Sequence, residues 1–395
     1  MKIRMSGLVL AVAVLFAAAP ARAQFEVGGK KIQIHGFFSQ GFVLTDKNNF
    51  LTMKTSDGSA AFTDGGMNIS TKLTNKFRVG AQAYTRNIGE LSNGRVELDW
   101  AYGDYRFNDW LGIRAGKVKS TMGLYNDTQD MEFLHAFALL PQSVYPTDLR
   151  ASNISHRGGD IYGDINGKKA GTFSYVFYGG LRSDDPRGGY RYGLADGGIP
   201  VTGALTGYRI GGDVRWQTPL EGLLVGATVV RVRTELTASL AAAGNLPLFI
   251  QTPGAMNLRY YGEYQKGGLK LAAEYGRDYA RLTFTPRVIA EGQLDTRGWY
   301  VSGSYKLHPR LEAGAYRGQY VYDAGVSRSR PDNHIDDTAL VARFNLKSFW
   351  NVKVEGHFMD GYGNPAGTRS FYRRTNPQGL APRTNMLILR TGVNF

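Results

Sequence analysis

The chain has 395 residues, including 51 Gly, 23 Tyr and 20 Phe, and it contains no cysteine. The lack of cysteine excludes a disulfide framework, a cysteine metal site and a cysteine nucleophile. The formal net charge of +14 indicates an anionic partner, such as small anions or lipid phosphate. No nucleic-acid-binding motif is recognisable, so we expect no nucleic-acid partner.

The N-terminus has the order of regions found in a secretory signal peptide. Lys2 and Arg4 precede an apolar run at 8–19, which is followed by small residues up to Ala23. The run is shorter than the ~20 apolar residues that a spanning helix needs. We therefore predict a signal peptide at 1–23, cleaved after Ala23, and a mature chain at 24–395.

Downstream of this segment, stretches of alternating hydrophobicity recur. In 32–45 the residues Ile32, Ile34, Phe38, Phe42 and Leu44 share one face, while Phe37, Gln40 and Val43 break the pattern. The alternation is as clear in 208–217, where apolar and charged residues occupy opposite faces. Successive strand side chains point to opposite faces, so these stretches predict strands with one apolar and one polar side. The alternation fails near Gly103, which we interpret as a β-bulge.

Short and long connections alternate between the predicted strands. Short turns fall near 74–76, 108–109, 166–167, 219–222, 266–268, 308–310 and 348–350. Longer connections lie at about 46–58, 89–95, 123–157, 184–203, 237–255, 284–296, 323–337 and 361–383. Seven short reversals imply eight hairpins, or sixteen strands. Short turns at one end and long loops at the other are typical of outer-membrane barrels, and Trp110, Trp216 and Trp350 near the short turns fit a membrane interface.

The stretch 384–395 supports the same interpretation. Leu387, Leu389, Val393 and Phe395 share one face, and Met386 and Ile388 are apolar exceptions on the other. This stretch resembles the closing strand of Gram-negative outer-membrane barrels, which implies that the barrel-assembly machinery reads Phe395. A strand of a soluble β-sandwich is the alternative.

Three further stretches carry a family resemblance: HGFFSQGF at 35–42, the segment 94–127, and LLPQSVYP at 139–146. They look most like the phosphate-selective and related substrate-specific porins of Gram-negative bacteria. The resemblance implies one all-β transmembrane antiparallel barrel over 24–395, in the outer membrane, commonly as a homotrimer. It also implies passive diffusion of small hydrophilic anions, such as phosphate or small carboxylates.

The longest connection, at 123–157, is the third long loop, and in porins this loop folds into the barrel. It carries Asp127, Asp130 and Glu132, and its apolar stretches 133–140 and 141–145 could pack on the inner wall. We predict that its carboxylates form a constriction opposite a basic wall. An external, solvated loop is the alternative.

Basic residues that lie on the polar face of their predicted strands are the candidates for this wall. They are Arg78, Arg86, Arg209, Arg215, Arg231, Arg233, Arg259, Arg343 and Arg390, together with Lys270, Lys347 and Lys353. Arg114, Lys117 and Lys119 lead into the third loop, and we expect at least one of them at the narrowest point. The pattern predicts an anion-preferring pore, although each residue could instead be paired with a neighbouring acid.

Two competing functions remain open at this stage: a non-conducting adhesin or structural barrel, and a barrel hydrolase. His156 follows Ser155, but no nucleophile motif surrounds the pair. We predict no catalytic residue, no metal site and no cofactor. Arg369, Arg373, Arg374 and Arg383 in the last long loop could funnel anions, bind lipopolysaccharide phosphates or simply be solvated.

Overall fold

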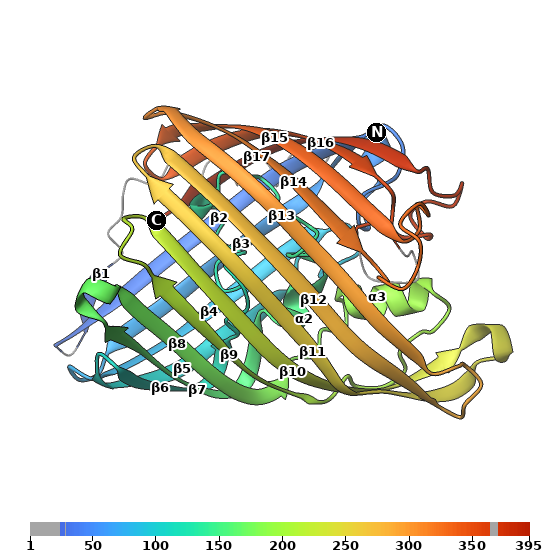
Figure 1. Ribbon diagram of the computed structural model, residues 1–395, viewed down its shortest axis with the longest axis horizontal. Coiled ribbons are helices and arrows are strands. Elements are labelled where there is room, and N and C mark those ends of the chain that lie inside the picture. Colours follow the sequence, from blue (N-terminus) through green and yellow to red (C-terminus); the bar gives the residue numbers. More distant parts are fainter. Residues whose placement is uncertain (1–23, 28, 364–369) are drawn as a thin grey trace.

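The computed structural model describes residues 24–27, 29–363 and 370–395, so the predicted signal peptide at 1–23 and Arg369 lie outside the described residues. Strands β2 to β17 form one antiparallel sheet, and the pairing of β17 with β2 closes it into a barrel (Figure 1). A short strand β1 (Gln24–Val27) pairs with the beginning of β2. The predicted all-β barrel of sixteen strands is confirmed.

The barrel strands are long and are joined by little helical structure. They are β2 (Lys30–Thr45), β3 (Ser59–Lys72), β4 (Phe77–Ile88), β5 (Val96–Asn108), β6 (Leu111–Lys119), β7 (Ser155–Asn166), β8 (Thr172–Arg182), β9 (Tyr208–Gln217), β10 (Leu223–Leu240), β11 (Leu246–Lys266), β12 (Leu269–Thr285), β13 (Gly292–His308), β14 (Leu311–Val321), β15 (His334–Lys347), β16 (Trp350–Asp360) and β17 (Arg383–Asn394). In the described part of the chain, the α-helices are α2 (Arg150–Asn153) and α3 (Gly189–Asp196). Within the described ranges, no helix is long and apolar enough to cross a membrane.

The seven short turns all join consecutive strands as predicted. One predicted long connection, 237–255, is wrong, because β10 continues to Leu240 and β11 begins at Leu246. The resulting hairpin projects beyond the barrel at the lower right of Figure 1. Leu236, Leu248 and Ile250 on its inner side pack against Leu205, so the loop between β8 and β9 covers these apolar side chains.

The β-bulge lies a few residues before its predicted position. Gly103 stays in register opposite Val79, and the irregularity falls where Gln82 and Ala83 of β4 pair with Trp100 and Leu98. The extra residue is therefore Asp99. A bulge re-aims a side chain, and here the carboxylate of Asp99 points into the barrel, where it accepts hydrogen bonds.

The inside of the barrel holds a packed core at the long-loop end. Met386 and Ile388, the apolar exceptions of β17, join Val43 of β2 in one cluster of buried residues. Phe50 and Phe371, from the first and last long loops, complete this cluster. The apolar side chains that break the alternation therefore face inward, where loops cover them.

Phe395 lies beside β2 at the seam of the barrel. Its backbone N–H donates to the Gly36 carbonyl at 2.9 Å, and its carbonyl accepts from the Gly36 N–H at 3.1 Å. A side chain at position 36 would meet the Phe395 ring at 2.4 Å, so glycine is needed for this close approach.

Charged residues form a belt on the outer face of the barrel, near the long-loop end. Asp295 accepts from Arg277 at 2.7 Å and from Arg297 at 2.6 Å, and Arg317 lies 3.2 Å from Asp336. We call these five residues the outer charge belt. Trp299, Val301, Tyr305 and Leu307 continue the same face of β13 towards the short turns.

Candidate functional site

The connection between β6 and β7, residues 120–154, folds into the barrel as predicted, and we call it the constriction loop. The Gly123 N–H donates to Thr228 Oγ1 of β10 at 2.9 Å, and Ser143 Oγ donates to the Trp299 carbonyl of β13 at 3.0 Å. Phe137 packs on Tyr316 of β14 with ring centroids 5.1 Å apart. The apolar segment of the loop thus finds partners on the inner wall, which explains why the loop turns inward.

Lys353 of β16 holds the loop backbone on one side of the barrel. Its ammonium group is fully buried and donates to the carbonyls of Glu132, His135 and Phe137 at 2.9, 2.8 and 3.0 Å. It also forms an ion pair with the Glu132 carboxylate. Because an irregular loop has no ladder to satisfy its carbonyls, this one lysine replaces several backbone hydrogen bonds.

Three further wall charges bind the same segment. The Glu355 carboxylate accepts from the N–H groups of Ala138 and Leu139 at 2.7 and 3.0 Å. Arg343 donates to the carbonyls of Phe133 and His135 at 2.8 and 2.9 Å. Arg390 donates to the Ala138 carbonyl and pairs with Asp64 of β3 at 2.8 Å. These side chains fix the loop and are not free to meet a solute.

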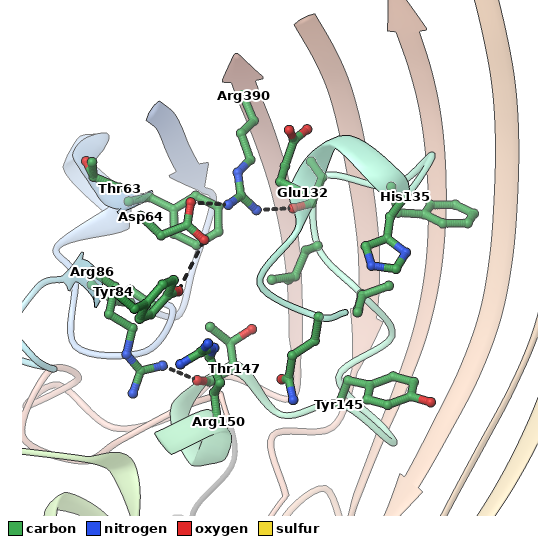
Figure 2. A pocket seen from close by; sticks show the side chains of 17 residues that line it. Thr63, Asp64, Tyr84, Arg86, Glu132, His135, Tyr145, Thr147, Arg150 and Arg390 are labelled. Carbon is green, nitrogen blue, oxygen red and sulfur yellow. Dashed lines mark hydrogen bonds and ion pairs between the residues drawn. The ribbon is translucent and has the colours of Figure 1, made fainter. Parts of the chain in front are cut away.

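A cavity with about 570 Å³ of empty space lies between the loop and strands β3, β4 and β17 (Figure 2). Arg390 spans from Asp64 to the loop, and Arg86 donates to the Thr147 carbonyl at 2.6 Å. Arg86 also lies 3.7 Å from Asp185 and is buried. The two predicted wall arginines in this cavity are therefore both engaged.

Asp130 and Arg150 form a buried charge cluster at the root of the loop. Arg150 lies 3.0 Å from Asp99 and 3.2 Å from Asp130, and Lys119 lies 3.0 Å from Asp130. Gln82 donates to both carboxylates at 3.0 Å. Burial alone would raise the pKa of Asp130, but the charges of Lys119 and Arg150 outweigh it and lower this pKa to about 2.

The opposite side of the lumen is more open. A cavity with about 840 Å³ of empty space, part of it solvent, is lined by Arg114, Arg215, Asp127 and Asp213. Arg215 pairs with Asp213 at 2.9 Å, and Arg114 pairs with Asp160 at 2.8 Å. Asp127 faces this cavity from the constriction loop, so the predicted opposition of a loop acid and wall arginines occurs here.

A larger cavity, with about 1210 Å³ of empty space including solvent, lies on the long-loop side of the constriction loop. Arg209 of β9 lines it and donates to the carbonyls of Ser152 and Asn153 at 3.0 and 2.9 Å. Arg182 of β8 lines it as well. Met122 and Gly123 of the loop lie between this cavity and the one around Arg215.

Three predicted wall residues lie on the outer face, contrary to expectation. Arg231 pairs with Ile210 and Met256, which are 58% and 44% exposed on that face. Arg233 shares this face through its ion pair with Glu235. Lys117 is opposite Ala101 and Arg157, again on the outer side. The cause for Arg231 and Arg233 is that the apolar side of β10 faces inward here, where Val230 and Val232 pack with Met122 of the constriction loop and Tyr178. Lys117 shares the outer face of β6 with Ile113, which is 43% exposed.

Four predicted wall residues remain. Lys270 of β12 lies 3.0 Å from Glu263, and Lys347, at the end of β15, is exposed beside Trp350. Arg78 and Arg259 face inward without joining the constriction. Arg78 lies near a short turn and donates to Ser70 Oγ at 2.7 Å. Arg259 is buried and pairs with Asp278 at 2.7 Å.

Sequence reasoning missed the roles of Arg150, Arg182 and Glu355. The alternation of β16 places the side chains of Lys353 and Glu355 inside the barrel. It does not reveal that they bind a loop more than 200 positions away in the sequence. Arg150 lies in the loop itself, where the alternation of side chains between two faces of a strand does not apply. Arg182 ends β8, and its inward parity could have been counted from Phe177 and Leu181, which are exposed on the other face.

Two other kinds of site, a metal site and a hydrolase triad, can be compared with the described residues. Within the described ranges, no group of three or more His, Cys, Asp or Glu residues could hold a metal ion. His156 Nδ1 lies 3.0 Å from Ser120 Oγ, but both residues are fully buried. The second ring nitrogen of His156 faces the Gly159 carbonyl at 3.4 Å rather than a carboxylate. This pair lacks the orienting acid of a hydrolase triad.

The fold matches solved outer-membrane channels. OmpT of Vibrio cholerae is 12% identical, with a TM-score of 0.58, covering 94% of this chain and 100% of that one. The outer-membrane channel DcaP of Acinetobacter baumannii is 13% identical, with a TM-score of 0.58 and coverage of 94% and 99%. An anion-selective porin from Comamonas acidovorans is 12% identical, with a TM-score of 0.53 and coverage of 93% and 100%.

The chain has the fold of outer-membrane porins of Gram-negative bacteria. A second structure of the Vibrio protein, with a TM-score of 0.54, is described as a trimer form. No protein-family model matches the chain, and no curated protein matches its sequence.

Proposed function

We propose that the chain forms a water-filled channel for passive diffusion of small hydrophilic solutes across the outer membrane, with a preference for anions. The observation that carries the anion preference is the position of four arginines along the open side of the lumen. Arg182 and Arg209 line the cavity on the long-loop side, and Arg215 and Arg114 line the cavity on the short-turn side. Arginine rows of this kind replace part of the hydration of a permeating anion.

The distribution of the other charges supports the same proposal. Asp127, Asp160 and Asp213 reduce the positive potential on the short-turn side. On the long-loop side the carboxylate of Asp278 is bound by Arg259, so the charges of Arg182 and Arg209 are not offset there. An anion would therefore meet its most favourable potential on entering from the long-loop side.

The zero-current potential of the purified protein in a planar bilayer, under a KCl gradient, tests this function. We expect a potential of the sign given by faster chloride movement. Cation selectivity would contradict the anion preference. An absence of conductance from a correctly folded barrel would instead favour the adhesin or structural alternative.

We also propose a homotrimer, supported by small side chains on the outer face of β4 to β6. Small side chains occupy neighbouring positions there, with Ala81 beside Ala101 and Gly103 beside Ala115. Small residues allow close approach of a second sheet face. Light scattering on the detergent-solubilised protein should give three times the mass of one chain.

Contacts with the membrane and with the assembly machinery complete the proposal. The outer charge belt lies where lipid headgroups or lipopolysaccharide phosphates would meet the barrel. In the last loop, Arg374 and Arg383 lie near Asp196 and Asp360, so their charges are partly offset. Phe395 remains 47% exposed at the seam, where the barrel-assembly machinery could bind it.

A further inference from the structure

The cavity on the long-loop side of the constriction loop combines a pair of arginines with an apolar wall. Among the residues that line it, Leu194 comes from α3, Val230 and Val232 from β10, and Leu282 and Leu294 from β12 and β13. The wall is thus mostly apolar, and its charged residues are Arg182, Arg209 and Asp278. A channel that passed only hydrated inorganic ions would have no use for such a wall.

Arg182 and Arg209 supply the positive charge of the cavity. Arg209 is 3% exposed, and its terminal nitrogens bind Ser120, Ser152 and Asn153 of the constriction loop and its root. Arg182 donates to Thr234 Oγ1 and lies over the Tyr190 ring, 5.9 Å from its centroid. The two arginines lie on neighbouring strands, because Arg209 pairs with Gly180 of β8 and the Arg182 N–H donates to the Gly207 carbonyl at 3.0 Å.

Both arginines keep an unused donor. Within the part of the chain that the structure describes, the Nε atoms of Arg182 and Arg209 are buried and have no hydrogen-bond partner. Buried polar groups are normally satisfied, so an unpaired donor on each of two neighbouring cations requires an explanation.

The nearby carboxylates are already bound to other cations. Asp278 pairs with Arg259 at 2.7 Å and accepts from Asn257 at 2.6 Å. Asp184 forms an ion pair with Arg191 and accepts from the Leu205 N–H at 3.1 Å. The acid that lines the cavity, Asp278, is thus bound to a third cation, and the positive charges of Arg182, Arg209 and Arg259 outnumber it.

We propose that this cavity is a binding site for an organic monocarboxylate with an apolar body, such as an aromatic or branched-chain acid. The carboxylate would take the free donors of Arg182 and Arg209, since charge-assisted bonds to guanidinium are the strong ones. The apolar body would lie against Leu282 and Val232. A doubly charged inorganic ion fits less well, because the apolar wall cannot replace the water that it loses.

This inference rests on the proposed pore function, because it concerns a site within the same lumen. Its test is the block of chloride current by added acids in planar bilayers. We expect benzoate to halve the current at about one tenth of the concentration that acetate requires, because only benzoate places a ring on the apolar wall. Phosphate should need at least as much as acetate.

Two variants test the two halves of the site. R182Q should raise the half-blocking concentration of benzoate about tenfold, through loss of one charge-assisted bond. L282S should raise it several-fold for benzoate and leave acetate unchanged. R231Q is the matched control for R182Q, because it removes the same charge from the outer face of the barrel, and it should leave the block unchanged.

The outcomes distinguish a failure of the carboxylate site from a failure of the proposed pore function. An anion-selective pore that benzoate blocks no better than acetate or phosphate would overturn the inference and leave the proposed function standing. A cation-selective pore would overturn both. If R182Q does not fold, L282S still tests the inference. An equal change in the half-blocking concentrations of benzoate and acetate would exclude the apolar subsite.

Discussion

The two sides of the lumen use similar side chains for opposite purposes. On the side of β3 to β5 and β15 to β17, Lys353, Arg343, Arg390 and Arg150 are each bound to loop backbone or to buried carboxylates. On the side of β6 to β13, Arg114, Arg182 and Arg215 line cavities, and Arg209 lines one while also donating to two loop carbonyls. The pinned side holds the constriction loop in place, and the open side leaves the space through which a solute could pass.

The difference lies in what surrounds each charge rather than in the charge itself. A buried ion loses its hydration and needs several partners to compensate, so the pinned side is dense in hydrogen bonds. A charge beside open solvent keeps its hydration and can exchange it for that of a solute. Substitutions should therefore affect stability on the pinned side and selectivity on the open side.

The largest effect is expected from K353M. The change removes the donor to three loop carbonyls and leaves the Glu132 carboxylate buried beside them, which should cost about 3–5 kcal/mol. Because the loop then loses its attachment, single-channel conductance should rise. K347M is the control, because Lys347 is an exposed lysine beside a short turn and pairs with Trp350 rather than with the loop. Unchanged conductance in K353M would mean that other contacts suffice to hold the loop.

Acid should weaken the pinned side through His135. Burial and the charges of Lys353 and Lys270 lower the pKa of His135 to about 4, although its hydrogen bond to Thr128 opposes this change. An unfolded histidine has a pKa of about 6.5, so the unfolded chain binds the proton first. Stability should therefore fall by about 2–3 kcal/mol between pH 6.5 and pH 4.

Urea unfolding of the wild type and of H135Q at pH 7 and at pH 4 measures this dependence. The glutamine can still donate to the Thr128 carbonyl but cannot gain a proton, so the variant should lose less stability on acidification. An identical pH dependence in both proteins would assign the effect to other groups.

D130N and D127N form a matched pair within one loop. D130N removes a charge that Lys119 and Arg150 bind, so it should cost about 2 kcal/mol of stability and leave ion selectivity unchanged. Thermal unfolding of the folded barrel, followed by gel mobility, would measure the first effect. A selectivity change without a stability change would reverse the roles of the two sides.

D127N should give the smallest effect, and only on permeation. A unit charge about 10 Å from an ion in water contributes about 0.4 kcal/mol. Removing it should favour an anion and disfavour a cation by this amount each, so the ratio of anion to cation permeability should rise about fourfold, as measured by the zero-current potential. Stability should not change, since Asp127 faces the cavity around Arg215 and Arg114.

The architecture was largely predictable, because strand period and turn chemistry are local properties of the chain. The seven short turns follow from residues that lie next to one another. The inward course of the third loop was expected from its length, its apolar stretches and the resemblance to porins. The projecting hairpin of β10 and β11 was not predicted, because its apolar residues are covered by Leu205 from another loop. Such a partner is distant in sequence and leaves no local pattern.

For the candidate site, the sequence predicted only which charged residues face the lumen, and not what each of them binds. The alternation correctly placed Arg209, Arg215 and Arg390 inside. It misplaced Arg231 and Arg233, because Val230 and Val232 face inward and pack against Met122 of the constriction loop. Parity could not separate Arg390, which binds the loop, from Arg215, which faces a cavity. That distinction depends on where the constriction loop lies, and the loop's course is set by contacts across the whole barrel.

The outer charge belt has a consequence for the membrane that the barrel can occupy. Below it, Trp299 and Val301 begin an apolar stretch of β13 that ends near the short turn. A bilayer whose hydrocarbon reached Arg277 or Arg297 would have to dehydrate them, and arginine at the midplane costs about 2–4 kcal/mol. The belt therefore sets an upper limit on hydrophobic thickness, and a thicker bilayer would have to thin locally or tilt the barrel.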